Sequence, residues 1–429
     1  MSFWLFLITV VCGGVNHSHG FADMPQPLAG TNTYQLRMPG AIATMDDDYI
    51  CTAFKLDPEK EMFITQFRVE GTAERAHHMI LSGCAGDMSD SSTPSWKCGS
   101  HGTGKVSCSG PTRILYAWAK NADGTRLPPS VGFRIGGTGK SRVKYLIIQV
   151  HYANKLPPGV RDYSGLDLEI TSEPQKYIAG ILLMLALPEI PPHQAVVNSD
   201  ICCPIDVTAI HIFAARVHAH GLGTVVTSYK YNPKTQATEL IVKGNPQWPQ
   251  AFYPTTREFA MTKGDEILMR CTYSSLGKNT FTYAGLSSSD EMCNVYMMYY
   301  TNADNGTEFQ SCGYYCNDEQ NRAYPADSIQ PLPSNPMLEA YAIHGQSQIE
   351  EQDTFQLASQ VHHEHQTPEE TTKQEQPLAM NVVPGKEETL NEKENKAAIK
   401  AANQDVTVKK KRREDHFWSI LFFIRRFFS

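Results

Sequence analysis

Ile210-His211-Ile212-Phe213-Ala214-Ala215-Arg216-Val217-His218-Ala219-His220 is the stretch from which the rest of the chain can be interpreted. It is rich in β-branched and aromatic residues and contains neither Gly nor Pro, a composition that predicts a β-strand. Side chains of a strand alternate between its two faces, so Arg216, His218 and His220 would share one face. Two neighbouring imidazoles can be ligands of one metal ion or two incidental histidines, and the pair alone does not decide between these alternatives.

The composition of the whole chain favours an all-β, secreted protein. Its 429 residues include 30 Gly and 26 Pro, with few long stretches of helical periodicity, which favours short strands and turns. The net charge of −7 gives no reason to expect nucleic acid as a partner. The apolar run at residues 3–12 is too short to cross a bilayer, and we interpret residues 1–20 as a secretory signal peptide.

Cysteine usage points to the same compartment. The chain has 11 Cys, and removal of Cys12 with the signal peptide leaves an even number, as expected for disulfides in an oxidising compartment. No Cys-x-x-Cys spacing of the kind used by zinc sites is present. The sequence alone does not give the connectivity of the disulfides.

Turn-rich segments divide the chain into blocks. Short apolar runs alternate with turn residues over residues 34–172, and Ser172-Glu173-Pro174 ends this first β-rich domain. A second β-rich domain is expected over residues 173–333. Its wholly apolar run at 178–187 is too short for a membrane span and predicts a buried strand. Asn305-Gly306-Thr307 is a sequon that predicts glycosylation of Asn305.

The C-terminal part has a different composition. Residues 334–408 are expected to form a disordered polar linker, because residues 346–405 cannot bury enough apolar surface to offset chain entropy. Its stretch His362-His363-Glu364-His365 can bind a metal ion, although a polar patch without function is favoured. Residues 409–429 join a basic run to an aromatic-rich apolar run, which suits an anchor at the membrane interface. The alternative is a tail that is removed during maturation.

Three histidines of the first domain form a second candidate group of ligands. His77 and His78 are adjacent, so both can face one ion only at a bulge or in a loop. His151 belongs to the alternating run at 143–152 and shares a face with Gln149 there. Each of these histidines, taken singly, is equally compatible with no ligand role.

Met292 would complete a three-ligand set in the second domain. A methionine among apolar residues is usually core filler, but Met292, Asn294 and Tyr296 have the same parity and would share one face of a strand. A thioether beside imidazoles favours copper, particularly Cu(I), over zinc. If this face opposes the strand of Arg216, the guanidinium would suit a substrate that bears a carboxylate.

From about residue 36 to residue 333 the chain resembles the copper- and ascorbate-dependent peptidylglycine alpha-hydroxylating monooxygenases. The order and spacing of several stretches together make this resemblance specific. The matching stretches are Arg37-Met38-Pro39-Gly40, His77-His78-Met79, Ile114-Leu115-Tyr116-Ala117-Trp118-Ala119, Gln149-Val150-His151-Tyr152, Arg216-Val217-His218-Ala219-His220, Pro249-Gln250-Ala251-Phe252-Tyr253-Pro254 and Ser288-Ser289-Asp290-Glu291-Met292-Cys293-Asn294.

The resemblance implies two antiparallel jelly-roll β-sandwich domains that face each other across a wet cleft. It places two copper ions on the two ligand groups, one on His77, His78 and His151 and the other on His218, His220 and Met292. The catalytic residues that it implies are His218, His220, Met292 and Tyr296. The residues that it implies for the substrate are Arg216, Asn294, Tyr296 and Gln149, with Tyr49 near the first copper.

The implied reaction is hydroxylation of the Cα of a C-terminal glycine in glycine-extended peptides, the first step of C-terminal amidation. Ascorbate would be the electron donor and dioxygen the co-substrate. The region after Pro333 is too short and polar for the lyase domain of bifunctional family members, so a separate lyase would complete amidation. The expected location is the secretory pathway, in granules or outside the cell, with membrane-surface contact through residues 409–429.

By the pattern of the family, four disulfides are implied: Cys51–Cys98, Cys84–Cys108, Cys203–Cys312 and Cys271–Cys293. One further bridge of the family is absent, because Tyr163 stands where a Cys is expected. Cys202 and Cys316 are additional to the pattern. We predict that they pair with each other near the Cys203–Cys312 bridge, with an exchange of partners between the two bridges as the alternative.

Two other functions compete with this one. A dopamine beta-monooxygenase-like amine hydroxylase shares the ligand pattern and the use of ascorbate, but its amine substrate has no carboxylate for Arg216. A non-enzymatic, secreted copper-binding module would have lost a ligand or a substrate-binding residue, and none is missing from the sequence.

Overall fold

A computed structural model describes residues 21–89, 93–98, 106–137, 143–206, 209–285, 287–302 and 309–332, which fall in one compact unit. The expected signal peptide, the sequon at Asn305, the polar linker with its histidines and the basic, aromatic tail lie outside the described residues. Within the described part, no helix is long and apolar enough to cross a membrane.

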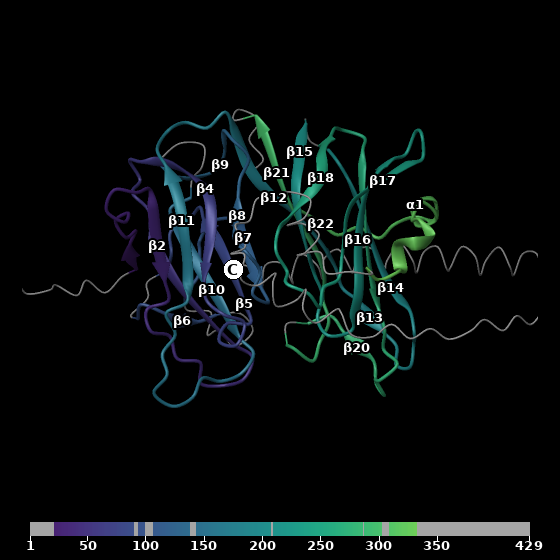
Figure 1. The fold of residues 1–429 in the computed structure, drawn as a ribbon, viewed down its shortest axis with the longest axis horizontal. Helices are drawn as coiled ribbons and strands as arrows, with labels where there is room; N and C mark the ends of the chain where they lie inside the picture. Colours follow the sequence, from purple (N-terminus) through teal and green to yellow (C-terminus); the bar gives the residue numbers. More distant parts are fainter. Residues whose placement is uncertain are drawn as a thin grey trace, which may run out of the picture. The chain divides into compact units, whose positions relative to one another are not determined.

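The regular secondary structure of the described residues is almost entirely β-strand, as the composition predicts (Figure 1). The strands of the first half are β1 Ala22–Asp23, β2 Thr33–Arg37, β3 Asp48–Lys55, β4 Glu61–Glu70, β5 His78–Cys84, β6 Trp96–Lys97, β7 Thr112–Ala119, β8 Thr125–Arg126, β9 Val131–Gly136, β10 Tyr145–Tyr152 and β11 Gly165–Thr171.

The second half continues the pattern and ends in two short helices. Its elements are β12 Tyr177–Ala186, β13 Glu189–Ile190, β14 Val197–Pro204, β15 Ile210–His218, β16 Gly223–Asn232, β17 Ala237–Gly244, β18 Tyr253–Met261, β19 Glu266–Tyr273, β20 Thr282–Tyr283, β21 Cys293–Asn302, β22 Phe309–Cys312, the α-helix α1 Asp318–Arg322 and the 3-10 helix η2 Ala326–Ile329.

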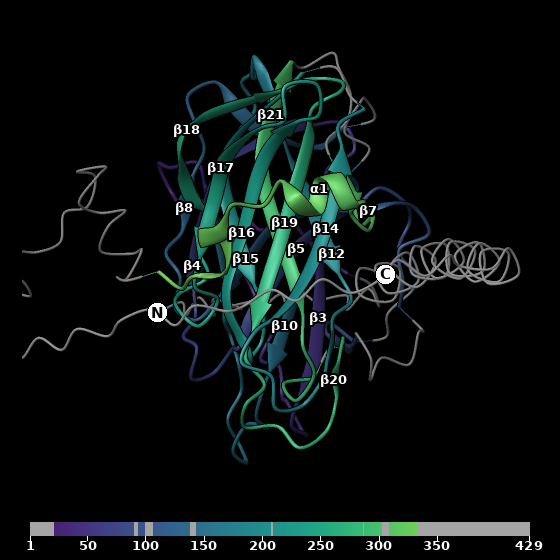
Figure 2. The same cartoon turned by 90° about the vertical axis from the view of Figure 1, so that its right-hand side faces the viewer.

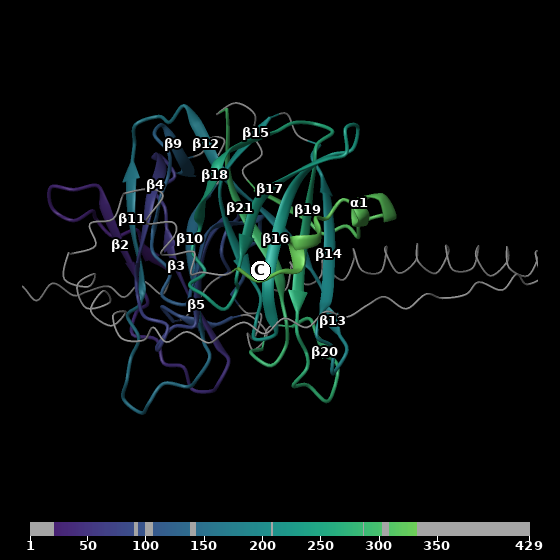
Figure 3. The same ribbon diagram turned by 45° about the vertical axis from the view of Figure 1, so that its right-hand side comes forward.

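Most strands belong to three sheets. A six-stranded sheet of the first half has the order β1-β3-β10-β5-β7, with β6 beside β3, and a four-stranded sheet of the second half has the order β14-β19-β16-β17. A ten-stranded sheet, β18-β15-β21-β12-β9-β4-β11-β2 with β8 and β22 at its sides, runs through both halves. Figure 3 shows β15 and β21 as one layer and β14, β16 and β19 as the next, with α1 outermost.

The two halves are joined by main-chain hydrogen bonds. Strand β12 pairs in parallel with β9 through Tyr177↔Val131 and Ile178↔Gly132, and the Tyr177 amide donates to the Ser130 carbonyl at 3.0 Å. Strand β12 is buried from its second residue to its last, because it lies between β21 on one side and β9 and β22 on the other. The apolar run predicted as a buried strand is therefore confirmed.

Five disulfides link the described residues, and one of them is the predicted Cys202–Cys316 pair. Cys202 and Cys203 are neighbours on β14, so their side chains leave opposite faces of the strand. Cys203 and its partner Cys312 pack in the core beneath the four-stranded sheet, whereas Cys202 and Cys316 pack on its outer side with Tyr324. Figure 2 shows α1 crossing this outer face. The remaining bridges are Cys51–Cys98, Cys84–Cys108, Cys203–Cys312 and Cys271–Cys293, as the family pattern implied.

Candidate metal centres

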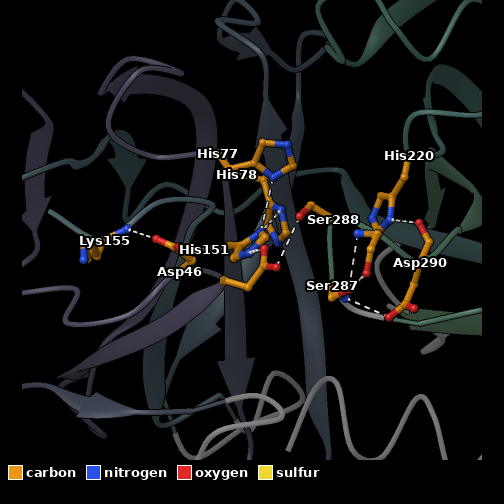
Figure 4. A network of polar contacts seen from close by, with 11 residues as sticks. Asp46, His77, His78, His151, Lys155, His220, Ser287, Ser288 and Asp290 are labelled. Atoms are coloured by element: carbon orange, nitrogen blue, oxygen red, sulfur yellow. Dashed lines mark hydrogen bonds and ion pairs between the residues drawn. The ribbon is translucent and has the colours of Figure 1, made fainter.

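Three histidines converge in the first half, as the sequence predicts. His151 lies on β10 directly opposite His78, the first residue of β5, and His77 lies just before that strand. The His77 amide donates to the His151 carbonyl at 2.8 Å, which turns the imidazole of His77 toward the other two. The Nδ1 atom of His151 lies 3.2 Å from that of His77 and 3.3 Å from that of His78 (Figure 4).

The surroundings of this trio keep its imidazoles neutral. Burial and the neighbouring imidazoles lower the pKa of His78 well below its usual value and that of His151 to about 4. Burial is also the main cause that lowers the pKa of His77. Three neutral imidazoles with converging Nδ1 atoms are a good set of ligands for Cu, Zn or Ni ions. The sequence predicted this group without showing which nitrogen of each ring faces inward.

Asp47 selects the ring nitrogen that His151 offers. Its Oδ1 atom lies 3.1 Å from Nε2 of His151, so Nε2 carries the hydrogen and Nδ1 keeps its lone pair. The ring of Tyr49 stacks on that of His151 with 4.1 Å between centroids, which fixes the plane of the imidazole. Sequence reasoning placed Tyr49 near this group but missed Asp47, whose backbone has a left-handed φ of 52°.

Asp47→Asn is expected to weaken Cu(II) binding to the trio by about tenfold, since loss of a ligand's hydrogen-bonded carboxylate typically costs 10- to 100-fold in affinity. Asn tolerates the left-handed backbone of this position, so the fold should be retained. Competition titration with a chelator measures the affinity. Asp46→Asn is the matched control, because Asp46 accepts a hydrogen bond from the Lys155 amide and not from an imidazole (Figure 4). Equal affinities of the Asp47 variant and the unmodified protein would contradict this role.

The second group lies at the end of β15. Nε2 of His218 is 3.1 Å from Sδ of Met292, the residue that precedes β21. The Nδ1 atoms of both histidines of this group are engaged with oxygen acceptors, 2.7 Å from Oε1 of Gln250 for His218 and 2.8 Å from the Asp290 carbonyl for His220. Both rings therefore keep Nε2 free as a ligand.

One correction concerns the strand itself. Strand β15 ends at His218, so His220 lies beyond it and not on the same strand face. The buried carboxylate of Glu291 is the reason, because it accepts hydrogen bonds from the amides of His220 at 2.9 Å, Leu222 at 2.6 Å and Met292 at 3.1 Å. These amides donate to the Glu291 carboxylate, so they are not available for pairing with a neighbouring strand. Glu291 thereby holds the main chain of two ligands, His220 and Met292, in one place.

The parity argument for the neighbouring residues is confirmed. In the register of β15 and β21, Arg216 lies opposite Tyr296 and His218 opposite Asn294. The Arg216 guanidinium is 5.1 Å from the centre of the Tyr296 ring. Asn294 donates through Nδ2 to the Tyr296 hydroxyl at 3.5 Å, and its Oδ1 atom is buried without a hydrogen-bond partner.

Arg216 is a buried cation, only 3% exposed. Its Nε and one Nη atom donate to the main-chain carbonyl and the side-chain oxygen of Gln250 at 2.9 and 3.0 Å, both neutral acceptors. Among the described residues no carboxylate lies within ion-pair distance of it. A buried charge without a counter-ion is costly, so the arrangement favours an anionic ligand at this place. Sequence reasoning missed Gln250, although the residue lies in a stretch that carried the resemblance.

Gln149 is not brought to this group. It shares a face of β10 with His151, but its Nε2 atom lies 3.7 Å from Sγ of Cys98, against the Cys51–Cys98 disulfide. His151, two residues further along that face, is the residue of β10 that belongs to the first ligand group. Gln149, which the resemblance implies for the substrate, therefore contacts a disulfide of the first half in this structure.

The two ligand groups are close together. The rings of His78 and His218 are 6.4 Å apart between centroids. Two cavities lie beside them. One of about 10 Å³, which is little more than the space of one water, is lined by residues that include Arg216, His218, Met292 and Tyr296. The other, of about 180 Å³, is lined by residues of both groups.

Comparisons with known proteins agree with this ligand chemistry. Residues 34–157 match the family model of the copper type II ascorbate-dependent monooxygenase N-terminal domain, and residues 177–325 match that of its C-terminal domain. The chain is 38% identical over 324 residues to peptidylglycine alpha-amidating monooxygenase of Rattus norvegicus, which covers 75% of this chain and 32% of the relative. It is 27% identical over 280 residues to DBH-like monooxygenase protein 1 of Homo sapiens, which covers 60% of this chain and 45% of that protein.

A further relative has the same extent of similarity. Peptidyl-glycine alpha-amidating monooxygenase A of Xenopus laevis is 38% identical over 313 residues, which cover 72% of this chain and 32% of the relative. The chain thus spans about a third of the length of the amidating relatives. The two domain models match adjacent segments that together make up more than half of the chain, and each contains one of the ligand groups. The chain belongs to the copper type II ascorbate-dependent monooxygenase family.

Proposed function

We propose that this protein hydroxylates the Cα of the C-terminal glycine of glycine-extended peptides, the first step of C-terminal amidation. The observation that supports this substrate best is the buried guanidinium of Arg216, which has only neutral acceptors among the described residues and lies two positions before His218. A peptide carboxylate would supply the missing counter-ion and leave the adjacent Cα near the second ligand group.

The proposed ligands of two copper ions are the two groups described above. His77, His78 and His151 would hold one ion through Nδ1, and His218, His220 and Met292 would hold the other through Nε2 and Sδ. Neutral imidazoles and a thioether suit copper in both oxidation states, and a thioether particularly suits Cu(I). When bound, the two ions would supply one-electron chemistry with ascorbate and dioxygen.

The residues of the chain bind and orient the peptide in this proposal. Arg216 would grip the carboxylate through its fork of N–H donors. Burial raises the pKa of Tyr296, so its hydroxyl stays protonated and can donate to the carboxylate. Asn294 has a buried oxygen without a partner, which could accept from a peptide N–H. Because the cavity at these residues has room for about one water, peptide entry requires the side chains around it to move apart.

Domain organisation and cellular context belong to the same proposal. Residues 34–172 and 173–333 would be the two copper domains, with a signal peptide before them and a polar linker and interfacial tail after them. A separate lyase would convert the hydroxyglycine product to the amide. The proposed location is the secretory pathway, which five disulfides among the described residues support.

Mass spectrometry tests the function directly. Copper-loaded protein, ascorbate and oxygen should convert a peptide that ends in glycine to a product heavier by one oxygen atom. Dopamine and a peptide that ends in an amide are the matched controls, and both should remain unchanged because neither offers a carboxylate to Arg216. Oxidation of dopamine in place of the peptide would establish an amine hydroxylase. If neither the peptide nor dopamine is oxidised, the result would favour a copper-binding module that lacks this activity.

A further inference from the structure

The larger of the two cavities connects the ligand groups. Its volume is about 180 Å³, and one histidine from each group, His77 and His220, contributes to its wall. Both of these rings are only half-buried, unlike the buried rings of His78, His151 and His218. A small molecule in this cavity would therefore touch the accessible edge of both metal centres. The full lining consists of His77, Ala119, Lys120, His218, Ala219, His220, Gly221, Gln247, Gln250 and Ser288.

Lys120 is the single cation in this lining. Strand β7 ends at Ala119, and the next two residues, Lys120 and Asn121, have left-handed φ angles of 56° and 55°. The Asn121 side chain fixes this turn by accepting a hydrogen bond from the Ala73 amide at 2.6 Å. Left-handed backbone is uncommon for residues other than Gly and Asn, so the turn is a specific feature that places the lysine beside the cavity.

The ammonium of Lys120 has neutral partners. It donates to the Pro246 carbonyl at 2.8 Å and to Oε1 of Gln247 at 3.3 Å. In the part of the chain that the structure describes, no carboxylate is within ion-pair distance of it. Two carboxylates of the ligand groups are engaged elsewhere: Glu291 accepts three amide N–H groups, and Asp47 accepts from His151 and from the Ser288 hydroxyl. The cavity therefore combines one cation with neutral hydrogen-bonding groups.

We propose that this cavity binds the reductant, the ascorbate monoanion, with Lys120 as its counter-ion. The inference rests on the proposed use of ascorbate and deepens it by assigning the place where ascorbate binds. A ring-shaped monoanion with several hydroxyl groups matches the size of the cavity, its single charge and its amide and hydroxyl lining. A peptide carboxylate is the weaker match, because Arg216 lies at the smaller cavity beside Met292.

One binding place beside both centres agrees with the stoichiometry of the reaction. Each ascorbate monoanion would give one electron to one bound Cu(II), which would become Cu(I), release its proton to solvent and leave as the ascorbyl radical anion. Two ascorbate molecules must therefore bind in turn for each hydroxylation. Since His77 and His220 both line the cavity, neither centre needs a reductant site of its own.

Anaerobic reduction without peptide tests this assignment independently of hydroxylation. The loss of the Cu(II) electron paramagnetic resonance signal is followed in rapidly frozen samples as the ascorbate concentration is varied. In Lys120→Gln, the ascorbate concentration that gives half the maximal rate should rise about fivefold to tenfold, as expected when a partly buried ion pair is lost. Lys120→Arg keeps the charge and should remain within about twofold of the unmodified protein.

Two controls separate binding from structural effects. Lys144→Gln removes an exposed lysine that pairs with Asp87, and it should leave reduction unchanged. Reduction by a neutral catechol should be the same in Lys120→Gln and in the unmodified protein, because no charge is recognised. Copper content and thermal unfolding verify that each variant folds and is loaded. An equal loss with catechol, or an unchanged ascorbate dependence of the reduction rate in Lys120→Gln, would overturn the assignment. Failure of hydroxylation alone would leave this result standing.

Discussion

Met292→Ile is expected to lower kcat by about two orders of magnitude or more, because loss of a direct ligand should exceed the 10- to 100-fold effect of losing a ligand's hydrogen-bond partner. The Sδ atom lies 3.1 Å from Nε2 of His218 and is buried with it. Isoleucine has a similar volume and no donor atom, so the substitution removes the ligand and keeps most of the packing. Its cost in folding free energy should stay below about 1.5 kcal/mol.

Two measurements identify the cause of this loss. X-ray absorption of the Cu(I) protein should show the copper–sulfur contribution in the unmodified protein and lose it in Met292→Ile. Met298→Ile is the matched control, since Met298 is fully buried on β21 away from the ligand group, and it should keep both the sulfur signal and the activity. Normal turnover by Met292→Ile would show that the thioether is not a ligand needed for the reaction.

Arg216→Gln is expected to raise the KM for a glycine-extended peptide by about 10- to 100-fold, which corresponds to the 1.5–3 kcal/mol of a hydrogen bond to a charged group. The guanidinium is buried and is the charged group closest in sequence to His218. Glutamine can still donate to one oxygen of the carboxylate but has no charge. The value of kcat should fall less than KM rises. Part of the effect will still appear in kcat, because Arg216 and His218 share the acceptor Gln250.

The substrate provides the control for this second variant. A peptide that ends in glycinamide lacks the carboxylate, so its weak binding to the unmodified protein should be about the same in Arg216→Gln. Arg216→Lys retains the charge without the planar fork and should give an intermediate KM. An unchanged KM for the glycine-extended peptide in Arg216→Gln would contradict the proposed carboxylate site.

The alternation of strand side chains was enough to predict the centre of the second ligand group. It placed Arg216 and His218 on one face of their strand and Asn294 and Tyr296 on one face of theirs, and the register of β15 and β21 pairs these residues directly on a shared face of the sheet. The ends of the strands were not predictable in this way. His220 and Met292 lie just outside β15 and β21, where the carboxylate of Glu291 binds their amides. Side-chain periodicity contains no information about such a contact.

The residues that orient the ligands were missed for a related reason. Asp47 lies 104 positions from His151, and Gln250 lies 32 positions from His218. Neither belongs to a local pattern, and each acts through one hydrogen bond that only the folded chain creates. Lys120 is similar, since its place beside the cavity depends on a left-handed turn and on the loop that contains Gln247. Such residues have no spacing rule that could identify them before folding.

The adjacent cysteines of β14 have a consequence for oxidative folding. Cys202 and Cys203 bond to Cys316 and Cys312 on opposite faces of one strand. A slip of β14 by one residue against β19 would exchange these faces and expose the apolar side of the strand. The same slip would place Cys202 on the side of Cys312 and Cys203 on the side of Cys316. The two adjacent bridges therefore select the correct register, because both native disulfides can form together only when β14 pairs with β19 in that register.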